Sequence, residues 1–262
     1  MSLHREHHLE SEICEHLAQH GWLYEPEAAK DFDAASGLYL PDLIAWLQAT
    51  QIEAHAALER REGGRLAAML AERLRKSLNE RGTLEVLRRG VEIVGLKQPL
   101  QLAQFKPALG LNPAMRERYA ANRLRVLRQV HHSPNLPAES IDLVLCLNGI
   151  PVATAELKSD YTQSVHDAVD QYRFDRHPQP KGGVAEVLLA FPGGALVHFA
   201  VSQSEVMMST RLSGAASTFL PFNRGNQGGA GNRPNPAGHA TAYLWEEVWE
   251  QESWLDILHR YL

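Results

Sequence analysis

Residues 141 to 158 read Ile-Asp-Leu-Val-Leu-Cys-Leu-Asn-Gly-Ile-Pro-Val-Ala-Thr-Ala-Glu-Leu-Lys, and this stretch decides the fold. Two apolar runs flank the dipeptide Asn148-Gly149, which strongly favours a tight turn between antiparallel strands. The stretch therefore predicts a β-hairpin of two buried strands. Asp142 stands near the start of the first strand, and Glu156 and Lys158 close the second.

The charged side chains of this hairpin need an explanation, because an unpaired buried charge is costly. Two carboxylates that converge beside a lysine can hold a divalent cation, with the lysine against a water or a phosphate. We therefore expect Asp142, Glu156 and Lys158 to be catalytic. Glu-x-Lys alone is a weak motif, but Lys158 is the only one of six lysines with a glutamate two positions before it. The alternative is a plain strand end where the charges reach water.

The turn decides whether the two carboxylates meet, because side chains alternate between the two faces of a strand. A two-residue loop pairs Leu147 with Ile150 and points Asp142 away from Glu156. A three-residue loop with a bulge at Gly149 shifts the pairing by one residue and places Asp142 diagonal to Glu156. Catalysis by this pair therefore predicts the three-residue, bulged turn.

The composition is that of an ordinary globular protein, with 262 residues of which 44% are hydrophobic and 22% charged. No apolar run approaches the length of a membrane span, and the amino terminus lacks the apolar core of a signal peptide. Cys14 and Cys146 lie in apolar patterns and are expected to be buried free thiols, which fits the cytoplasm. The formal net charge of −5 argues against a protein that coats nucleic acid through its overall charge.

Local basic segments are compatible with that net charge, because binding follows the local patch. One lies between residues 116 and 128 and carries five arginines. A second follows the hairpin and contains Arg173, Arg176 and Lys181. We expect this second segment to contact DNA phosphates, and the alternative for each residue is a solvated face.

Hydrophobic periodicity predicts an alternation of helices and strands along the chain. Helices are expected at residues 9–20, 41–48, 53–78 with a break at Gly63-Gly64, and 164–176, and in a tryptophan-rich segment that closes the chain. Residues 83–90 are expected to form a short helix or a turn. Strands are expected at residues 91–94, 121–130, 184–191, 195–201 and 206–212 beside the hairpin. Residues 223–239 are rich in glycine, asparagine and proline and predict a long loop.

Asp142, Glu156-x-Lys158 and the strand-strand-helix order around them resemble the PD-(D/E)xK nuclease superfamily. Further segments make the resemblance more specific, namely Gln129-Val130, Asn148-Gly-Ile-Pro-Val-Ala, Asp170-Gln-Tyr-Arg, Thr210-Arg-Leu, Phe219-Leu-Pro-Phe-Asn-Arg-Gly and Tyr243-Leu-Trp-Glu-Glu-Val-Trp. Together they resemble the amino-terminal nuclease region of the R (restriction, motor) subunit of type I restriction-modification enzymes. The resemblance covers essentially the whole chain.

The resemblance implies an α/β fold with a mixed β-sheet flanked by helices. It implies a Mg²⁺-dependent endonuclease, a type I site-specific deoxyribonuclease, that cuts double-stranded DNA together with modification and specificity subunits. The motor domains and their ATP site are expected elsewhere in the same polypeptide. We therefore expect residues 1–262 to be a nuclease domain fragment that is weak or inactive alone. Its core is expected at about residues 1–212, with residues 213–262 leading toward the motor.

Carried over to this sequence, Asp142 and Glu156 match the metal-binding carboxylates of the family and Lys158 matches the motif lysine. The backbone carbonyl of Leu157 is expected to join the carboxylates as a metal ligand. Glu10, on the first predicted helix, is the best match for a further acidic residue of the family and is a candidate metal ligand.

Gln171 matches the glutamine of a Gln-x-x-x-Tyr motif that many relatives carry on the helix after the lysine. The position four residues further holds Asp175, and the tyrosine is adjacent instead, at Tyr172. We expect Gln171 to contact the reacting water or the DNA backbone. Two rival functions stay open: a non-catalytic module that docks the motor or grips DNA, and a nuclease of a helicase-linked DNA repair system.

Overall fold

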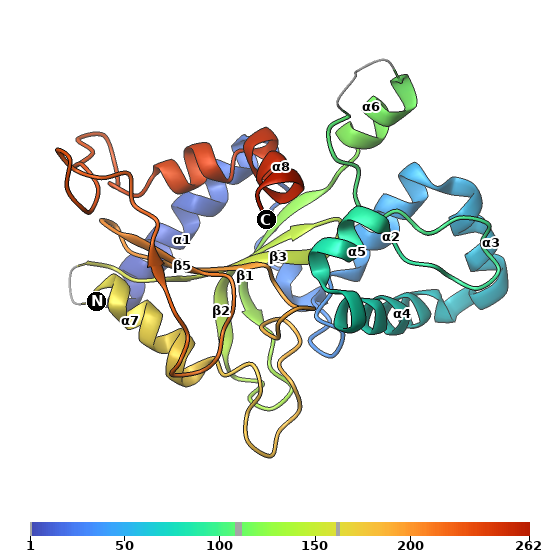
Figure 1. Cartoon of the computed structure of the whole chain (residues 1–262), viewed down its shortest axis with the longest axis horizontal. Helices are drawn as coiled ribbons and strands as arrows, with labels where there is room; N and C mark the ends of the chain where they lie inside the picture. Colours follow the sequence, from blue (N-terminus) through green and yellow to red (C-terminus); the bar gives the residue numbers. More distant parts are fainter. Residues whose placement is uncertain (1, 108–111, 161–162) are drawn as a thin grey trace.

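A six-stranded mixed sheet forms the centre of the molecule in the computed structural model, with helices on both faces (Figure 1). The structure describes residues 2–107, 112–160 and 163–262, with side chains from residue 7 onward. The strands lie in sequence order; β3 and β4 are parallel and every other neighbouring pair is antiparallel. They are β1 (Leu124–His131), β2 (Ser140–Leu147), β3 (Ile150–Leu157), β4 (Val197–Val201), β5 (Val206–Ser209) and β6 (Leu220–Pro221). The predicted α/β fold class is confirmed.

Helices follow most of the predicted helical segments. The α-helices are α1 (Ser2–Gln19), α2 (Leu40–Thr50), α3 (Ile52–Glu62), α4 (Leu66–Arg81), α5 (Thr83–Arg89), α6 (Pro113–Ala120), α7 (Val165–Asp170) and α8 (Gln251–Arg260). The shorter helices are η1 (Ala28–Asp31), η2 (Gly63–Arg65), and the π-helices η3 (Gln171–Asp175) and η4 (Leu244–Val248). Among the described residues, no helix is both long and apolar enough to cross a membrane.

The two faces of the sheet bury two separate hydrophobic clusters. The larger cluster packs α1, α2, α4 and the tryptophan-rich C-terminal segment on one face. Within it, Trp249 lies edge-on to Phe199 of β4 with 5.5 Å between ring centroids, and the Trp22 indole donates a hydrogen bond to the Trp249 carbonyl. The smaller cluster packs α7 and η3 on the other face. The C-terminal segment therefore belongs to the core, and its π-helix η4 packs against α1.

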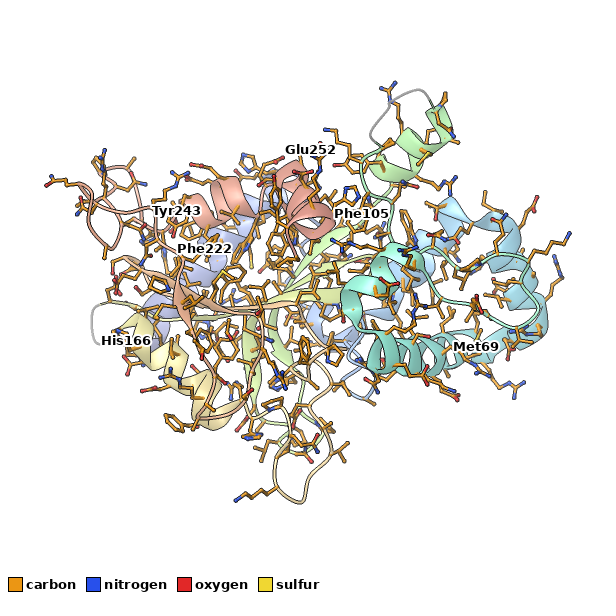
Figure 2. The ribbon with its side chains drawn as sticks, in the orientation of Figure 1. Met69, Phe105, His166, Phe222, Tyr243 and Glu252 are labelled. Atoms are coloured by element: carbon orange, nitrogen blue, oxygen red, sulfur yellow. The ribbon has the colours of Figure 1, made fainter. Side chains whose placement is uncertain are left out.

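Side chains fill the spaces between these layers. Figure 2 shows Phe222 and Tyr243 close together next to the loop at residues 223–239, where the Tyr243 hydroxyl donates to the Phe222 carbonyl. It also shows Phe105 beside α8, where its ring stacks on His259 with 4.9 Å between centroids. The predicted loop at residues 223–239 is confirmed as turns and isolated bridges.

Two predicted strands are wrong. In the segment 91–94, only Val91 forms a bridge, to Leu100. The segment 184–191 is not a strand, because its backbone bonds within itself, as in the 2.9 Å bond from the Leu189 amide to the Glu186 carbonyl. Its apolar residues Leu188 and Leu189 are nevertheless buried. The apolar pattern of this segment therefore indicated burial in the core and not pairing within a sheet. Helix α6 was not predicted.

The hairpin turn forms as the Asn-Gly dipeptide predicts. Asn148 and Gly149 have φ angles of 50° and 80°, which are the left-handed values of a two-residue type I′ turn. A Cβ atom on Gly149 would lie 2.2 Å from the Tyr39 carbonyl oxygen, so only glycine fits this close approach. The turn pairs Leu147 with Ile150.

The prediction of a three-residue turn is therefore wrong, and the required offset lies inside β3. Cys146 pairs with Pro151 while Leu145 pairs with Ala153, which leaves Val152 as an extra residue in a β-bulge. The bulge shifts all later pairing by one residue, down to Leu143 opposite Ala155. The next rung in this register places Asp142 opposite Glu156.

Candidate functional site

A row of three polar residues crosses β1, β2 and β3 at the same level. The pairing of β1 with β2 brackets Gln129 and places it across from Asp142, which in turn lies across from Glu156. Gln129 has a φ of 52°, an uncommon conformation for a residue other than glycine, and strained residues of this kind cluster at functional sites. The sheet therefore brings Asp142 and Glu156 together, as expected.

The Asp142 carboxylate takes the place of a sheet hydrogen bond. Its Oδ2 accepts a hydrogen bond from the Leu157 backbone amide at 2.7 Å, and its Oδ1 accepts one from the Gln129 side-chain amide at 3.1 Å. The regular pairing of β2 and β3 ends one rung earlier, at Leu143 and Ala155. Asp142 is partly exposed and thus stands where the two strands part.

Glu156 is fully buried, with 0% of its surface exposed. Its Oε1 accepts a hydrogen bond from Nε of Arg176 at 2.9 Å, whereas Oε2 has no partner in the described part of the chain. Burial raises the pKa of Glu156 well above its ordinary value, the Asp142 charge raises it further, and Arg176 opposes both. Glu156 therefore offers one buried oxygen that is still free to accept.

Lys158 extends past the end of β3. It lies two residues after Glu156 and so points to the same side of the strand. Its backbone amide donates to the Val201 carbonyl at 2.8 Å, which fixes its position beside β4. The side chain is partly exposed, and its charge is close enough to lower the pKa of Glu156. The structure thus places Lys158 beside the paired carboxylates.

Gln171 begins the π-helix that follows α7. A capping box between Ser164 and Asp167 starts α7 on the face where Glu156 is buried. The Arg176 amide closes the π-turn on the Gln171 carbonyl at 3.0 Å, and such turns are frequent at functional sites. The side-chain Oε1 of Gln171 is buried and has no partner in the described part of the chain.

Arg176 is a correction to the expected DNA contacts. Its side chain is only 7% exposed, and its guanidinium binds Glu156, Glu139 and the Ser140 carbonyl. Because the guanidinium of Arg176 is buried and bonded to these three groups, it cannot reach a phosphate at the surface. Arg173 and Lys181 stay predictions: Lys181 is exposed, and Arg173 is partly exposed and donates to the Ser217 carbonyl at 3.1 Å.

Glu10 lies next to the site, and its role as a metal ligand stays a prediction. The described residues contain no ready cluster of three His, Cys, Asp or Glu side chains that could hold a metal ion. Gln129 lies between Glu10 and Asp142, because its Nε2 donates to Glu10 Oε1 at 2.7 Å as well as to Asp142. Arg128 neutralises the buried Glu10 from the other side. Burial and the Asp142 charge nevertheless raise the pKa of Glu10.

The basic segment between residues 116 and 128 is not one surface. Arg125 is buried and binds Asp42 through two hydrogen bonds of 2.6 and 3.1 Å, and Arg123 binds the same carboxylate at 2.9 Å. These arginines fix α2 against β1. The alternation of the sequence placed them on a strand but gave no sign of the buried aspartate that pairs with them.

Sequence reasoning missed the roles of Gln129 and Arg176 within the site. Gln129 stood in one of the segments that carry the family resemblance, yet its spacing gave no hint of a bridge to Asp142. A signal for Arg176 was present, because a fully buried carboxylate requires a nearby cation or hydrogen-bond donor. Which cation would serve could not be read from the sequence.

A divalent cation fits the residues of this site. Mg²⁺ prefers oxygen ligands and is commonly held by one or two carboxylates together with waters. Asp142 and Glu156 supply two neighbouring carboxylates, and Oε2 of Glu156 is a buried acceptor that has no donor among the described residues. The Leu157 amide already bonds to Asp142, so its backbone lies at the same opening.

The mixed sheet, with paired carboxylates and a lysine where β2 and β3 part, defines an α/β protein with a restriction-endonuclease-like fold. The family model of the type I restriction enzyme R protein N terminus matches residues 4–217, from α1 to the segment that follows β5. The chain belongs to this family, which places it in a restriction system as a nuclease region. No curated protein matches the chain.

Proposed function

We propose that this chain is the Mg²⁺-dependent endonuclease domain of a type I restriction enzyme R subunit. It cleaves phosphodiester bonds of double-stranded DNA in the cytoplasm, in an ATP-dependent complex with modification and specificity subunits. The motor that binds ATP belongs to the motor domains of the R subunit. The observation that carries the proposal is the position of Asp142 opposite Glu156, one step beyond the last regular strand pair and beside Lys158, in a member of this family.

The cation would be held by Asp142, Glu156 and the backbone carbonyl of Leu157. In an antiparallel pair, the amide and carbonyl of one residue face the same neighbouring strand. Because the Leu157 amide reaches Asp142 on β2, its carbonyl faces the same opening. When bound, Mg²⁺ supplies a Lewis acid for the scissile phosphate and lowers the pKa of a water.

The remaining residues orient the attacking water and neutralise the charge of the phosphates. Lys158 directs its ammonium toward the attacking water or the charge that develops on the phosphate. Gln171 Oε1, which has no partner in the described part of the chain, accepts a hydrogen bond from that water, or the side-chain Nε2 of Gln171 donates to the DNA backbone. Arg173 and Lys181 contact phosphates, which gives binding without sequence preference, because phosphates are the same in every sequence.

The decisive experiment substitutes Asp142→Asn and Glu156→Gln in the R subunit of the reconstituted complex. We expect both variants to lose Mg²⁺-dependent DNA cleavage while ATP hydrolysis and assembly continue, because the site changes without the motor. Glu59→Gln, at an exposed carboxylate of α3, is the matched control and should cleave normally. Cleavage at the parental rate by both site variants would contradict the proposal. Loss of folding in both, seen by circular dichroism, would favour a structural role.

A further inference from the structure

We propose that Arg176 is a positioning residue for Glu156 and that Glu139 anchors it in this role. The inference rests on the proposed function, because it concerns how Glu156 is prepared to hold a divalent cation. Arg176 would act through Glu156 and would touch neither the cation nor the DNA.

The contacts of Arg176 fix the guanidinium in three directions. Nε donates to Glu156 Oε1 at 2.9 Å, one terminal nitrogen donates to Glu139 Oε2 at 3.0 Å, and the other donates to the Ser140 carbonyl at 2.8 Å. A planar guanidinium with all three sides bound has a single orientation. The side chain therefore joins the π-helix to the start of β2 and to the end of β3.

This orientation of the guanidinium determines which oxygen of Glu156 is not bonded to Arg176. Arg176 binds Oε1 alone, and Oε2 stays buried without a donor in the described part of the chain. Arg176 therefore holds the Glu156 carboxyl group from one side and leaves its other oxygen open.

Glu139 allows a metal ion to bind beside the positive charge of Arg176. An arginine that merely replaced the metal ion would bind both oxygens of Glu156. Here the guanidinium is shared with Glu139, whose carboxylate is 31% exposed and takes up part of the positive charge. Glu139 precedes β2 by one residue, so the anchor lies close in sequence to Asp142. The geometry points to support of the site rather than to competition for it.

The test is the affinity of the purified chain for Mg²⁺ and Ca²⁺, measured by titration calorimetry alongside the midpoint of thermal unfolding. Groups that orient metal ligands typically change metal affinity on the order of 10- to 100-fold when they are removed. We expect a loss of this size in Arg176→Met and a smaller loss in Arg176→Lys, which keeps the charge without the planar group. Glu139→Ala should also weaken binding, although it leaves Glu156 and Arg176 in place.

The matched control is Arg125→Met, because Arg125 is also a buried arginine with a carboxylate partner but lies away from the site. It should lower the unfolding midpoint without changing metal affinity. Unchanged or tighter metal binding in Glu139→Ala and Arg176→Lys would overturn the positioning role, even if Arg176→Met fails to fold. A parent chain that binds neither ion would instead contradict the proposed cation site itself, and the positioning role would fall with it.

Discussion

The side-chain amide of Gln129 donates a hydrogen bond to Oδ1 of Asp142 at 3.1 Å, from a backbone conformation with a φ of 52°. The same nitrogen donates to Glu10, and Ser140 donates to the other end of the amide at 2.7 Å. One side chain thus separates two acidic groups and fixes the rotation of one of them. The strained backbone of Gln129 is maintained because these three bonds depend on it.

Gln129→Leu should therefore destabilise the fold and disturb the site together. The leucine keeps the approximate shape but leaves buried Glu10 without one donor, which costs about 1–3 kcal/mol. We expect this loss in the free energy of unfolding by urea, accompanied by weaker Mg²⁺ binding. Ser140→Ala, which removes only the outer hydrogen bond to Gln129, should have the smaller effect on both. Equal stability of Gln129→Leu and the parent would show that the bridge is incidental.

Acid should destabilise the protein through His198. This histidine is buried, its Nδ1 lies 2.8 Å from the Thr154 hydroxyl, and burial lowers its pKa to about 3 from an unfolded value of 6.5. The unfolded state therefore takes up the proton first, so stability is full above pH 6.5 and falls as the pH drops toward 3. Between about pH 7 and about pH 5, His198 should account for a loss of about 2 kcal/mol.

The matching variant for this prediction is His198→Asn, which keeps a polar group but does not titrate. Its free energy of unfolding in urea should change less between the two pH values than that of the parent. Because each protein is compared with itself at the two pH values, the constant effect of the smaller side chain on the free energy of unfolding cancels. An identical pH dependence in both proteins would mean that His198 does not set the acid response.

DNA binding by the isolated chain should be weak, sensitive to salt and independent of sequence. The net charge of −5 gives little long-range attraction, and affinity from phosphate contacts falls steeply as salt increases. Arg173→Gln and Lys181→Gln should weaken binding about equally for unrelated duplexes, measured by fluorescence anisotropy at about 50 and about 200 mM salt.

The control for DNA binding is Arg65→Gln, an exposed arginine between α3 and α4, at the opposite end of the molecule from α7 (Figure 1). It should bind like the parent. A clear preference for one duplex over another would contradict the assignment of sequence recognition to a separate subunit.

Trp249→Ala should cost about 3–5 kcal/mol of the free energy of unfolding, because it removes a large, fully buried side chain. The ring packs on Phe199 of the central strand β4, and its backbone carbonyl accepts from Trp22 near the other end of the chain. Tyr261→Ala, at a residue that is 75% exposed, is the control and should change stability little. A small loss in Trp249→Ala would show that the C-terminal segment is only loosely attached.

The elements that local chemistry determines could be predicted from the sequence. The Asn148-Gly149 turn, its flanking strands and the helix that begins at Val165 follow from turn preference, apolar runs and capping, each of which acts over a few residues. The convergence of Asp142 and Glu156 was predicted because charges in buried strands need partners. These inferences required no knowledge of distant contacts.

Features that depend on distant contacts could not be predicted in the same way. The bulge at Val152 is an exception, because it directly follows Pro151 and a proline inside a central strand is a local sign of a bulge. The prediction placed the offset in the turn instead. The burial of Arg176 depends on the π-turn and on Glu139, 37 residues away. Residues 184–191 carry a strand-like pattern, and only the complete fold shows that no strand of the described residues pairs with them.

The bulge at Val152 has a consequence for how hairpins of this kind can vary. Five residues separate Asp142 from Asn148, whereas six separate Gly149 from Glu156, so the two arms of the hairpin differ in parity. Because the two arms differ by one residue, the two-residue turn and the opposing carboxylates are compatible only if one residue of the longer arm stays unpaired, as Val152 does. A single insertion or deletion in one arm would therefore place a core side chain opposite one of the carboxylates, whereas a paired change in both arms would keep Asp142 and Glu156 opposite each other. Parity, which can be counted in any sequence, is thus a constraint on the hairpin separate from the identity of its residues.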